Sequence, residues 1–422
     1  MAKPKLALIP SAQGSKFYSV LPSSGVGDFN FTRSGSATRI NSQGLIESVA
    51  NGVSRLNYPM IDGVVKGCPH HILEPQRTNL ITYSEDFSQW ASNGGTVTSN
   101  QTISPSGTLN ADKLSAFPNN GQHRLDFASS NVAGETTFSF FAKSVEYNSV
   151  WARIGLSTVF FDLENGESQN NTSATTSSTE YYGNGWYRCI MTKEISSANE
   201  ICRINLTQSY KDSSIFIGDG TSGIYIYGAQ FEQGSYPTSY IPTNGSTVTR
   251  SAETATGSGD AATFNDSEGV LMFEARTKDD GANKFITLSD GSDDNRITIY
   301  FYTSINDDIR FQIRSNNINQ PITPNPIGYN IDEFNKIAIK YKQNDVSAYI
   351  NGFLVLSNIG NLDTPLNLSR LAFDDGGGAN PFYGNTKQLQ YFDTTLNDNE
   401  LETLTSWVSF QDMAEGQLYT IE

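Results

Sequence analysis

The sequence predicts an all-β protein: two tandem antiparallel β-sandwiches of jelly-roll type, after an irregular N-terminal segment and before a short C-terminal helix. At 422 residues, the chain exceeds what one hydrophobic core usually organises. Short apolar runs with period-two alternation recur between turns rich in Gly, Asn and Asp, which is typical of sandwiches. The 11% of aromatic residues and 36 glycines also favour strands joined by many turns.

The N-terminal segment, residues 1–78, contains short apolar pieces separated by Gly, Ser and Pro. These pieces offer too little apolar surface to fold alone. We therefore expect the segment to pack on the next domain, on a sister chain or on an assembly partner. Its expected role is attachment and oligomerisation.

Residues 79–250 are expected to form the first sandwich. Turn signals such as Gly183-Asn184-Gly185 separate its apolar runs. The stretch TSATTSST at 172–179 is interpreted as an exposed loop or hairpin tip. The candidate strands are 137–142, 150–156, 159–163, 186–195, 202–208, 214–217 and 224–232.

A small, polar linker at 251–265 is expected to lead into the second sandwich, residues 266–422. Asn351-Gly352 predicts a two-residue hairpin turn. Asn397 is a helix cap signal, and Leu401, Leu404 and Val408 should pack against the sandwich. The candidate strands are 270–278, 284–289, 296–303, 308–315, 336–342, 346–356, 368–373 and 384–394.

The stretch 225–250 starts as a strand and then turns into a Tyr/Pro segment. Pro237 and Pro242 remove backbone donors, so strand pairing must end there. Tyr236 and Tyr240 lie beside these prolines. We expect them to pack at a domain junction rather than to form a sugar platform.

Charge and cysteine content exclude several functions. The net charge of −16, without a dense basic patch, argues against nucleic-acid binding. Cys68, Cys189 and Cys202 are odd in number and lack CxxC spacing, which argues against a disulfide framework and a zinc site. No signal peptide and no long apolar run are visible, so we expect cytoplasmic synthesis and no membrane insertion.

No catalytic residue is assigned. The sequence carries no nucleophile, zinc-protease, P-loop or dinucleotide motif, and His70, His71 and His123 lack an obvious partner. Paired carboxylates for glycoside hydrolysis stay open, because their separation depends on the fold and the chain has 44 acidic residues.

Calcium is the one cofactor considered, since hard oxygen ligands on loops suit this cation. Two acidic stretches are candidates, although neither matches an EF-hand and Asp-Gly is also an ordinary turn signal. The candidate ligands are Asp290, Asp293, Asp294, Asp374 and Asp375.

Sugar binding requires an exposed aromatic ring among polar groups. Trp90 and the pair Tyr181-Tyr182 lie in polar surroundings and are the candidate ligand-binding residues. Trp186 lies in an apolar strand and is expected in the core, whereas Trp407 should pack with the terminal helix.

Several motifs resemble known families. RTNLITYSEDF at 77–87, GWYR at 185–188, GAQFE at 228–232, PTSYIP at 237–242 and VTR at 248–250 resemble a sandwich module of tailed-bacteriophage structural proteins, similar to carbohydrate-binding modules. FTRS at 31–34 and ATR at 37–39 resemble the segment that precedes it. The strand at 336–342, Asn351-Gly352 and LETLT at 401–405 resemble a concanavalin A-like, laminin-G-type sandwich.

The resemblance implies a non-enzymatic virion protein, made in the host cytoplasm, of the tail-fibre or appendage type. Its expected partners are other virion proteins, sister chains in a homo-oligomer (a trimer in fibres) and host surface glycan. Two alternatives stay open: a head or tail decoration or scaffold protein with protein contacts only, and a glycan-degrading tailspike.

Overall fold

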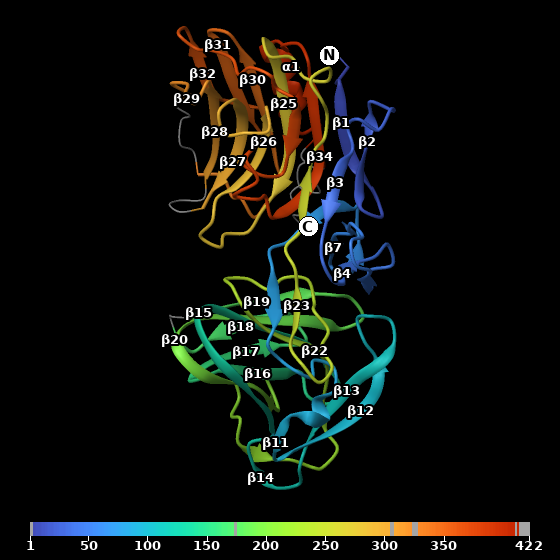
Figure 1. Ribbon diagram of the computed structural model, residues 1–422. Coiled ribbons are helices and arrows are strands. Elements are labelled where there is room, and N and C mark those ends of the chain that lie inside the picture. The colour runs from blue at the N-terminus through green and yellow to red at the C-terminus, as the bar shows by residue number, and fades with distance from the viewer. Residues whose placement is uncertain (1–2, 173–174, 304–307, 323–327, 410–411, 413–422) are drawn as a thin grey trace.

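The computed structural model describes residues 3–172, 175–303, 308–322, 328–409 and 412. Two β-sandwiches lie one above the other, and part of the N-terminal segment lies between them (Figure 1). The all-β class and the two sandwiches are confirmed. Their strands lie close to the predicted apolar runs, because residues that alternate between a buried and an exposed face also alternate between apolar and polar in the sequence.

The second sandwich is built from two sheets. The larger contains β24 (Thr254–Thr256), β3 (Phe29–Thr32), β2 (Lys16–Leu21), β1 (Leu6–Gln13), β34 (Gly384–Phe392), β25 (Glu268–Arg276), β30 (Asn335–Lys342), β31 (Asp345–Ile350) and β32 (Phe353–Ile359) in this order, with β6 (Leu56–Asn57) and β9 (His70–Leu73) attached at β34. The smaller contains β29 (Ile318–Asn319), β28 (Asp308–Ser315), β27 (Arg296–Tyr302), β26 (Lys284–Ser289) and β33 (Arg370–Ala372). One continuous core joins the two sheets.

The N-terminal segment contributes strands to this second sandwich. Leu6 of β1 lies opposite Tyr391 of β34, and Phe31 of β3 lies opposite Ala255 of β24. These strands thus pack on the second sandwich of the same chain, rather than on the domain that follows them in sequence. The predicted linker 251–265 is wrong in part, because β24 is paired strand. The small residues of β24 can pair at the edge of a sheet. Their partner, β3, is more than two hundred residues away in the chain, so the sequence around β24 does not reveal the pairing.

The first sandwich is a ten-stranded sheet folded over on itself. It contains β12 (Gly95–Ile103), β13 (Leu109–Ala116), β22 (Gly223–Gln233), β15 (Arg124–Ser144), β20 (Trp186–Thr207), β16 (Ser149–Ile154), β17 (Ser157–Asp162) and β18 (Ser168–Asn170) in this order, with β11 (Ala91–Asn93) on β15 and β19 (Thr175–Tyr181) on β20. The two long strands, β15 and β20, take part in both layers. Phe140, Val159 and Ile226 meet in one core between the layers.

Strand β19 corrects one prediction. Of the expected loop at 172–179, residues 175–179 lie in an edge strand paired with the first half of β20, and 173–174 lie outside the described residues. Thr-rich sequences are low in complexity, but β-branched residues favour strands. Thr176, Ser177 and Ser178 of β19 border the junction between the sandwiches.

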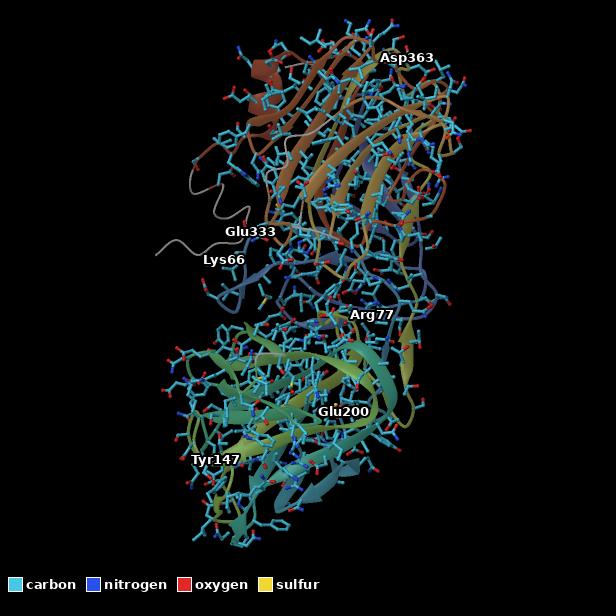
Figure 2. All side chains as sticks on the ribbon, turned by 90° about the vertical axis from the view of Figure 1, so that its left-hand side faces the viewer. Lys66, Arg77, Tyr147, Glu200, Glu333 and Asp363 are labelled. Atoms are coloured by element: carbon cyan, nitrogen blue, oxygen red, sulfur yellow. The ribbon has the colours of Figure 1, made fainter. Side chains whose placement is uncertain are left out.

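A narrow neck connects the first sandwich to the rest. β10 (Arg77–Asn79) enters it, β23 (Val248–Arg250) leaves it, and the two strands pair antiparallel. Arg77 lies at the waist between the two bodies (Figure 2). The first sandwich is therefore inserted between strands of the second, rather than simply preceding it. Two small hairpins border the two bodies: β4 (Ala37–Ile40) with β5 (Ile46–Val49), and β7 (Met60–Ile61) with β8 (Val64–Val65). A third short pair, β14 (Asn120–Gly121) with β21 (Phe216–Ile217), joins distant parts of the chain at the far end of the first sandwich.

The predicted C-terminal helix is α1 (Asp398–Thr405), and Asn397 forms a capping box with Glu400. Leu401 is fully buried against the second sandwich. Val408 lies beyond the helix end and is 94% exposed, so its predicted packing is wrong. No helix in the described part of the chain has the length and apolar character needed to cross a membrane.

Candidate functional site

The Tyr/Pro segment that follows β22 is fixed by side chains from the conspicuous sequence motifs. The amide of Asn79 donates to the carbonyl oxygens of Ala229 and Ile241, at 3.1 and 2.8 Å. Gln230 accepts the backbone N–H of Ile241 at 2.6 Å. Tyr240 is buried, and its hydroxyl lies 2.7 Å from Ser84 Oγ. The predicted packing role of Tyr240 is confirmed.

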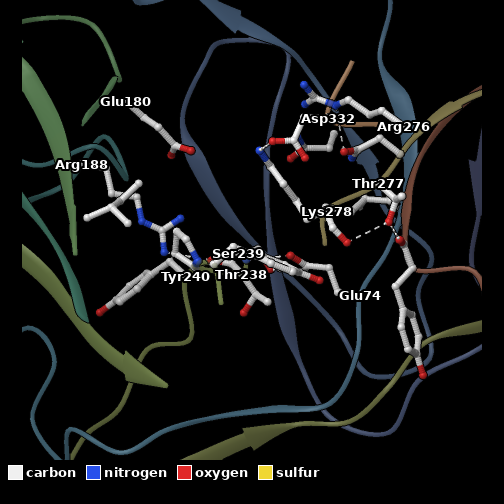
Figure 3. Close-up of a pocket in the computed structure, with 18 of the residues that line it drawn as sticks. Glu74, Glu180, Arg188, Thr238, Ser239, Tyr240, Arg276, Thr277, Lys278 and Asp332 are labelled. Carbon is white, nitrogen blue, oxygen red and sulfur yellow. Dashed lines mark hydrogen bonds and ion pairs between the residues drawn. The ribbon is translucent and has the colours of Figure 1, made fainter. Parts of the chain in front are cut away.

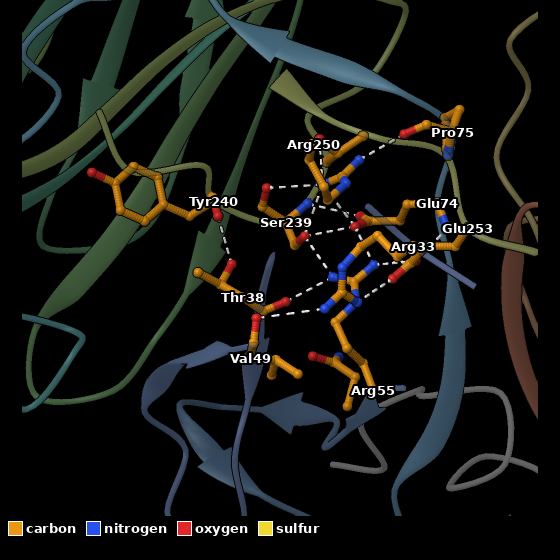
Figure 4. Close-up of polar contacts among 12 residues, drawn as sticks. Arg33, Thr38, Val49, Arg55, Glu74, Pro75, Ser239, Tyr240, Arg250 and Glu253 are labelled. Carbon is orange, nitrogen blue, oxygen red and sulfur yellow. Dashed lines mark hydrogen bonds and ion pairs between the residues drawn. The ribbon is translucent and has the colours of Figure 1, made fainter. Parts of the chain in front are cut away.

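Three arginines and two glutamates form a buried network beside this segment (Figure 4). Arg33 pairs with Glu253 at 2.8 Å, and Arg55 pairs with both Glu253 and Glu74, the latter at 2.8 Å. Arg250 completes the network through Glu74 at 2.9 Å. The network joins the N-terminal segment to the strands on either side of the neck.

Hydrogen bonds extend the network into the first sandwich. Arg55 donates to the Thr38 carbonyl at 2.7 Å and to Ser239 Oγ at 2.8 Å. Ser239 donates its N–H to Glu74 at 2.8 Å. Burial opposes ionisation of Glu74, but Arg250 and Arg55 outweigh it and hold its pKa well below the usual range. The junction is therefore fixed by paired charges.

A cleft of about 480 Å³ opens next to this network, where the two sandwiches and the N-terminal segment meet. Glu180 and Arg188 reach it from the first sandwich, and Arg276, Lys278 and Asp332 reach it from the second (Figure 3). Because both bodies contribute, neither sandwich forms the cleft alone.

Two charges facing this cleft lack ion-pair partners. Within the described residues, the side chain of Glu180 forms no hydrogen bond or ion pair. The guanidinium of Arg276 lies over the Phe334 ring, and its one hydrogen bond runs from Nε to Asn385 Oδ1, at 3.2 Å. Burial lowers the pKa of Arg276, although Glu180 and Asp332 oppose this shift. Lys278, in contrast, pairs with Asp332 at 2.8 Å. The cleft thus presents one carboxylate and one guanidinium that no opposite charge pairs within the described residues.

Arg188 forms the inner wall of the cleft. Its guanidinium donates to Ser139 Oγ at 3.1 Å and to the Thr238 carbonyl at 2.9 Å, while its buried Nε has no partner in the described structure. Burial and Glu180 raise the pKa of the neighbouring Tyr182, so its hydroxyl stays protonated. These groups can donate to and accept from a polyhydroxylated ligand.

A second hollow of about 660 Å³ adjoins the cleft and shares Glu180, Tyr182 and Arg276 with it. Tyr181 and Tyr187 line this hollow, and their ring centroids lie 4.8 Å apart. Tyr181 is 36% exposed. Of the two predicted ligand-binding tyrosines, Tyr182 therefore lines both the cleft and the hollow, whereas Tyr181 lines the hollow alone.

Trp90, the third predicted ligand-binding residue, is elsewhere and inaccessible. It is only 5% exposed, it packs against Phe87 and Phe127, and its Nε1 donates to the Tyr83 carbonyl at 3.0 Å. The prediction of an exposed Trp90 is wrong, because the polar residues around it in sequence do not surround it in space. Trp186 is buried, as predicted.

The structure brings the two acidic loops together around an arginine. Arg296 pairs with Asp293 at 2.9 Å and donates to the backbone carbonyl of Asp375 at 2.5 Å. Asp374 pairs with Arg370 at 2.9 Å. The described residues contain no group of three or more His, Cys, Asp or Glu side chains arranged to hold a metal ion.

The remaining candidate calcium ligands either accept hydrogen bonds from their own loop or are exposed at its surface. Asp290 accepts the Ser292 N–H at 2.9 Å and the Asn295 amide at 3.0 Å. Asp294 is exposed. The carboxylate of Asp375 accepts backbone N–H groups of its own loop, including that of Ala379 at 2.9 Å. This geometry favours turn formation, and calcium binding at these loops stays a prediction.

Sequence reasoning missed most of the charged residues at the cleft. Glu180 follows a low-complexity stretch, and Arg276 ends an apolar strand without any motif. Arg188 belongs to the GWYR motif, which was interpreted only as a family signature. Charged residues at strand ends carry no signal that separates a surface position from a cleft between two domains.

Comparisons with known proteins give only weak likenesses. No protein-family model and no curated protein matches the chain. Among solved structures, the CBM40 of a Ruminococcus gnavus IT-sialidase, bound to alpha2,3 sialyllactose, is similar at a TM-score of 0.30 and 16% identity, covering 36% of this chain and 88% of that one.

Two further structures are similar at comparable levels. Domain 4 of AbnA, an arabinanase from Geobacillus stearothermophilus in complex with arabinotriose, has a TM-score of 0.29 and 13% identity, covering 37% of this chain and 73% of that one. Mouse laminin alpha1 domains LG4-5 have a TM-score of 0.24 and 11% identity, covering 75% and 89%. Likenesses this low assign neither a family nor a ligand to this chain.

Proposed function

We propose that the protein is a non-enzymatic carbohydrate-binding protein that holds glycan in the cleft between its two sandwiches. The observation that carries this proposal is that the Glu180 carboxylate and the Arg276 guanidinium line the cleft and the adjoining hollow without ion-pair partners, and that the exposed ring of Tyr181 lines the same hollow. Sugars are bound by aromatic rings that cover their C–H faces and by polar groups that bridge their hydroxyls.

The cleft suits an uncharged sugar unit. Glu180 accepts hydroxyl hydrogens, whereas Arg276 and Arg188 donate to hydroxyl oxygens. The charges of Lys278 and Asp332 already compensate each other. The lining therefore offers donors and acceptors without a strong excess of either charge.

The biological setting follows from the sequence resemblance alone. We propose that the chain is a structural component of a tailed-bacteriophage particle, of the fibre or appendage type, and that the bound glycan belongs to the host surface. Assembly with other virion proteins and with sister chains, as a homo-oligomer, is part of this proposal. Locating the chain on particles with a specific antibody tests it, and absence from particles contradicts it.

Binding of host envelope glycans to the full-length chain tests the cleft. We expect saturable binding without product release, and at least about tenfold weaker binding in Glu180→Gln and Arg276→Gln, since each removes a charge-assisted hydrogen bond. Lys342→Gln is the control, because Lys342 pairs with Glu268 at 2.9 Å, and neither residue lines the cleft or the adjoining hollow.

Two experimental results would favour a different function. Release of shorter glycans would favour the glycan-degrading alternative, with Glu180 and Asp332 as the first carboxylates to test, since both line the cleft. Binding to particles but to no glycan would favour the decoration or scaffold alternative.

A further inference from the structure

The hollow beside the cleft is lined by four tyrosines from two parts of the chain. Tyr58 belongs to the N-terminal segment, and the other three belong to the first sandwich: Tyr181, Tyr182 and Tyr187. Tyr181 is exposed and the others are half-buried, so part of each side chain is accessible. Aromatic rings of this kind pack against the C–H faces of sugars.

Three of these tyrosines can form further hydrogen bonds through their hydroxyl groups. The Tyr58 hydroxyl has no hydrogen-bond partner within the described residues. Tyr181 accepts the backbone N–H of Gly185 at 3.2 Å, so its own hydrogen is available, and Tyr187 reaches the Glu164 carbonyl only at 3.4 Å. A tyrosine hydroxyl can both donate and accept, as a sugar hydroxyl does. The hollow can therefore bind sugar hydroxyls as well as sugar faces.

The charged groups at the hollow largely compensate one another. Asp62 pairs with Lys66 at 3.0 Å, and Glu180 and Arg276 carry opposite charges. Burial lowers the pKa of His70 well below its usual value, so its side chain is neutral at pH 7. Such a lining suits an uncharged sugar unit.

The hollow continues directly from the cleft. Both spaces are lined by the same five residues: Ile40, Asn57, Glu180, Tyr182 and Arg276. Glu180 and Arg276, labelled in Figure 3, therefore lie where the two spaces meet. With volumes of about 480 and 660 Å³, each space alone is within the range of small-molecule sites. A ligand bound in the cleft can thus extend into the hollow.

We infer that the cleft and the hollow are adjacent subsites for neighbouring sugar units of one chain, so that the ligand is an uncharged oligosaccharide rather than a single sugar. This inference rests on the proposed function and specifies the class of its ligand. Glu180 and Arg276 lie at the boundary between the two units, and Tyr58 and Tyr181 contact the unit in the hollow.

Calorimetry of the full-length chain with size-fractionated oligosaccharides tests this inference. The fractions, of one to six sugar units, are prepared by partial acid hydrolysis of the host envelope glycan that the chain binds. We expect the three-unit fraction to bind at least about tenfold more tightly than the one-unit fraction, because the hollow adds a ring contact and a hydrogen bond. Equal affinities would overturn the inference.

Two substitutions show whether this gain in affinity arises in the hollow. Tyr58→Phe removes a hydroxyl without a partner in the described structure, and we expect it to reduce the gain about fivefold. Tyr181→Leu removes an exposed ring and should reduce the gain to a similar extent. Tyr18→Phe and Tyr18→Leu are the matched controls, because Tyr18 of β2 is 37% exposed and lines neither space, and they should keep the gain.

The remaining outcomes separate this inference from the proposed function. A gain that survives both substitutions in the hollow overturns the inference, because the added units are then bound elsewhere. If the chain binds no host glycan, the proposed function fails together with the inference, whereas equal binding of all fractions refutes the inference alone. Tyr58→Phe keeps its ring, so it decides the test if Tyr181→Leu lowers the melting temperature more than Tyr18→Leu does.

Discussion

The junction between the sandwiches contains two groups of charged residues in opposite states. In the neck network, Glu253 and its arginines are buried and paired on every side. A short distance along the same junction, Glu180 and Arg276 line an open cleft without ion-pair partners. Glutamate and arginine thus have two roles at this junction. Where they form ion pairs they connect the two sandwiches, and where they are unpaired they can bind a ligand.

Removing one carboxylate from the buried network should have the largest effect, and it should act on the stability of the fold. Glu253→Gln leaves three buried guanidinium groups with one carboxylate, and we expect it to reduce the free energy of unfolding by about 3–5 kcal/mol. Glu47→Gln is the control, since it removes a solvent-exposed pair with Arg39 and should cost about 0–1 kcal/mol. Chemical denaturation measures both, and equal losses would contradict the distinction.

A second effect concerns acid. Burial lowers the pKa of His71 to about 4 and that of His70 well below its usual value. The unfolded chain therefore binds more protons below pH 6.5, so stability should fall as the pH drops from 6.5 towards 4, by on the order of 2–3 kcal/mol from His71.

Melting temperatures recorded between pH 8 and pH 4 measure this fall. His71→Gln should give a flatter profile, because it removes the buried group that the unfolded chain protonates. An unchanged profile in this variant would assign the acid sensitivity to other groups. The network carboxylate Glu74 is one, since its lowered pKa also makes stability fall once the pH drops below its ordinary value of 4.5.

The cleft charge should matter little for stability. Glu180→Gln makes the same chemical change as Glu253→Gln, but we expect a shift within about 0.5 kcal/mol because the carboxylate is exposed and unpaired. A loss of several kcal/mol in denaturation would mean that the cleft charge is structural, and the contrast within the junction would fail.

The smallest expected effect is that of calcium. Arg296 lies between the two acidic loops, and backbone N–H groups already occupy several carboxylate oxygens. Adding calcium, or removing it with a chelator, should therefore leave the melting temperature unchanged. A rise with calcium would favour the predicted cation site instead.

The sequence predicts local features well and long-range ones poorly. Alternation located most strands, and Asn351 and Gly352 adopt the positive φ values, 51° and 87°, that the hairpin requires. The pairing of Leu6 with Tyr391 and the network around Glu253 depend on residues far apart in the chain, which no local pattern encodes. Polar sequence surroundings predict exposure for Tyr181 and for Trp90 alike, but only Tyr181 is exposed, because sequence neighbours need not be spatial neighbours. The ligand-binding role of Tyr181 and Tyr182 stays a prediction.

The two-strand neck has a consequence for how such a protein can change. Because Arg77 and Arg250 are directly opposite each other, the framework around the insertion is continuous at that point, and a different module could enter and leave through the same pair of strands. The residues that the first sandwich contributes to the cleft would then change, while Arg276 and the rest of the second sandwich stayed the same. Exchange of a whole module at one site is thus a route to a new binding preference without redesign of the framework.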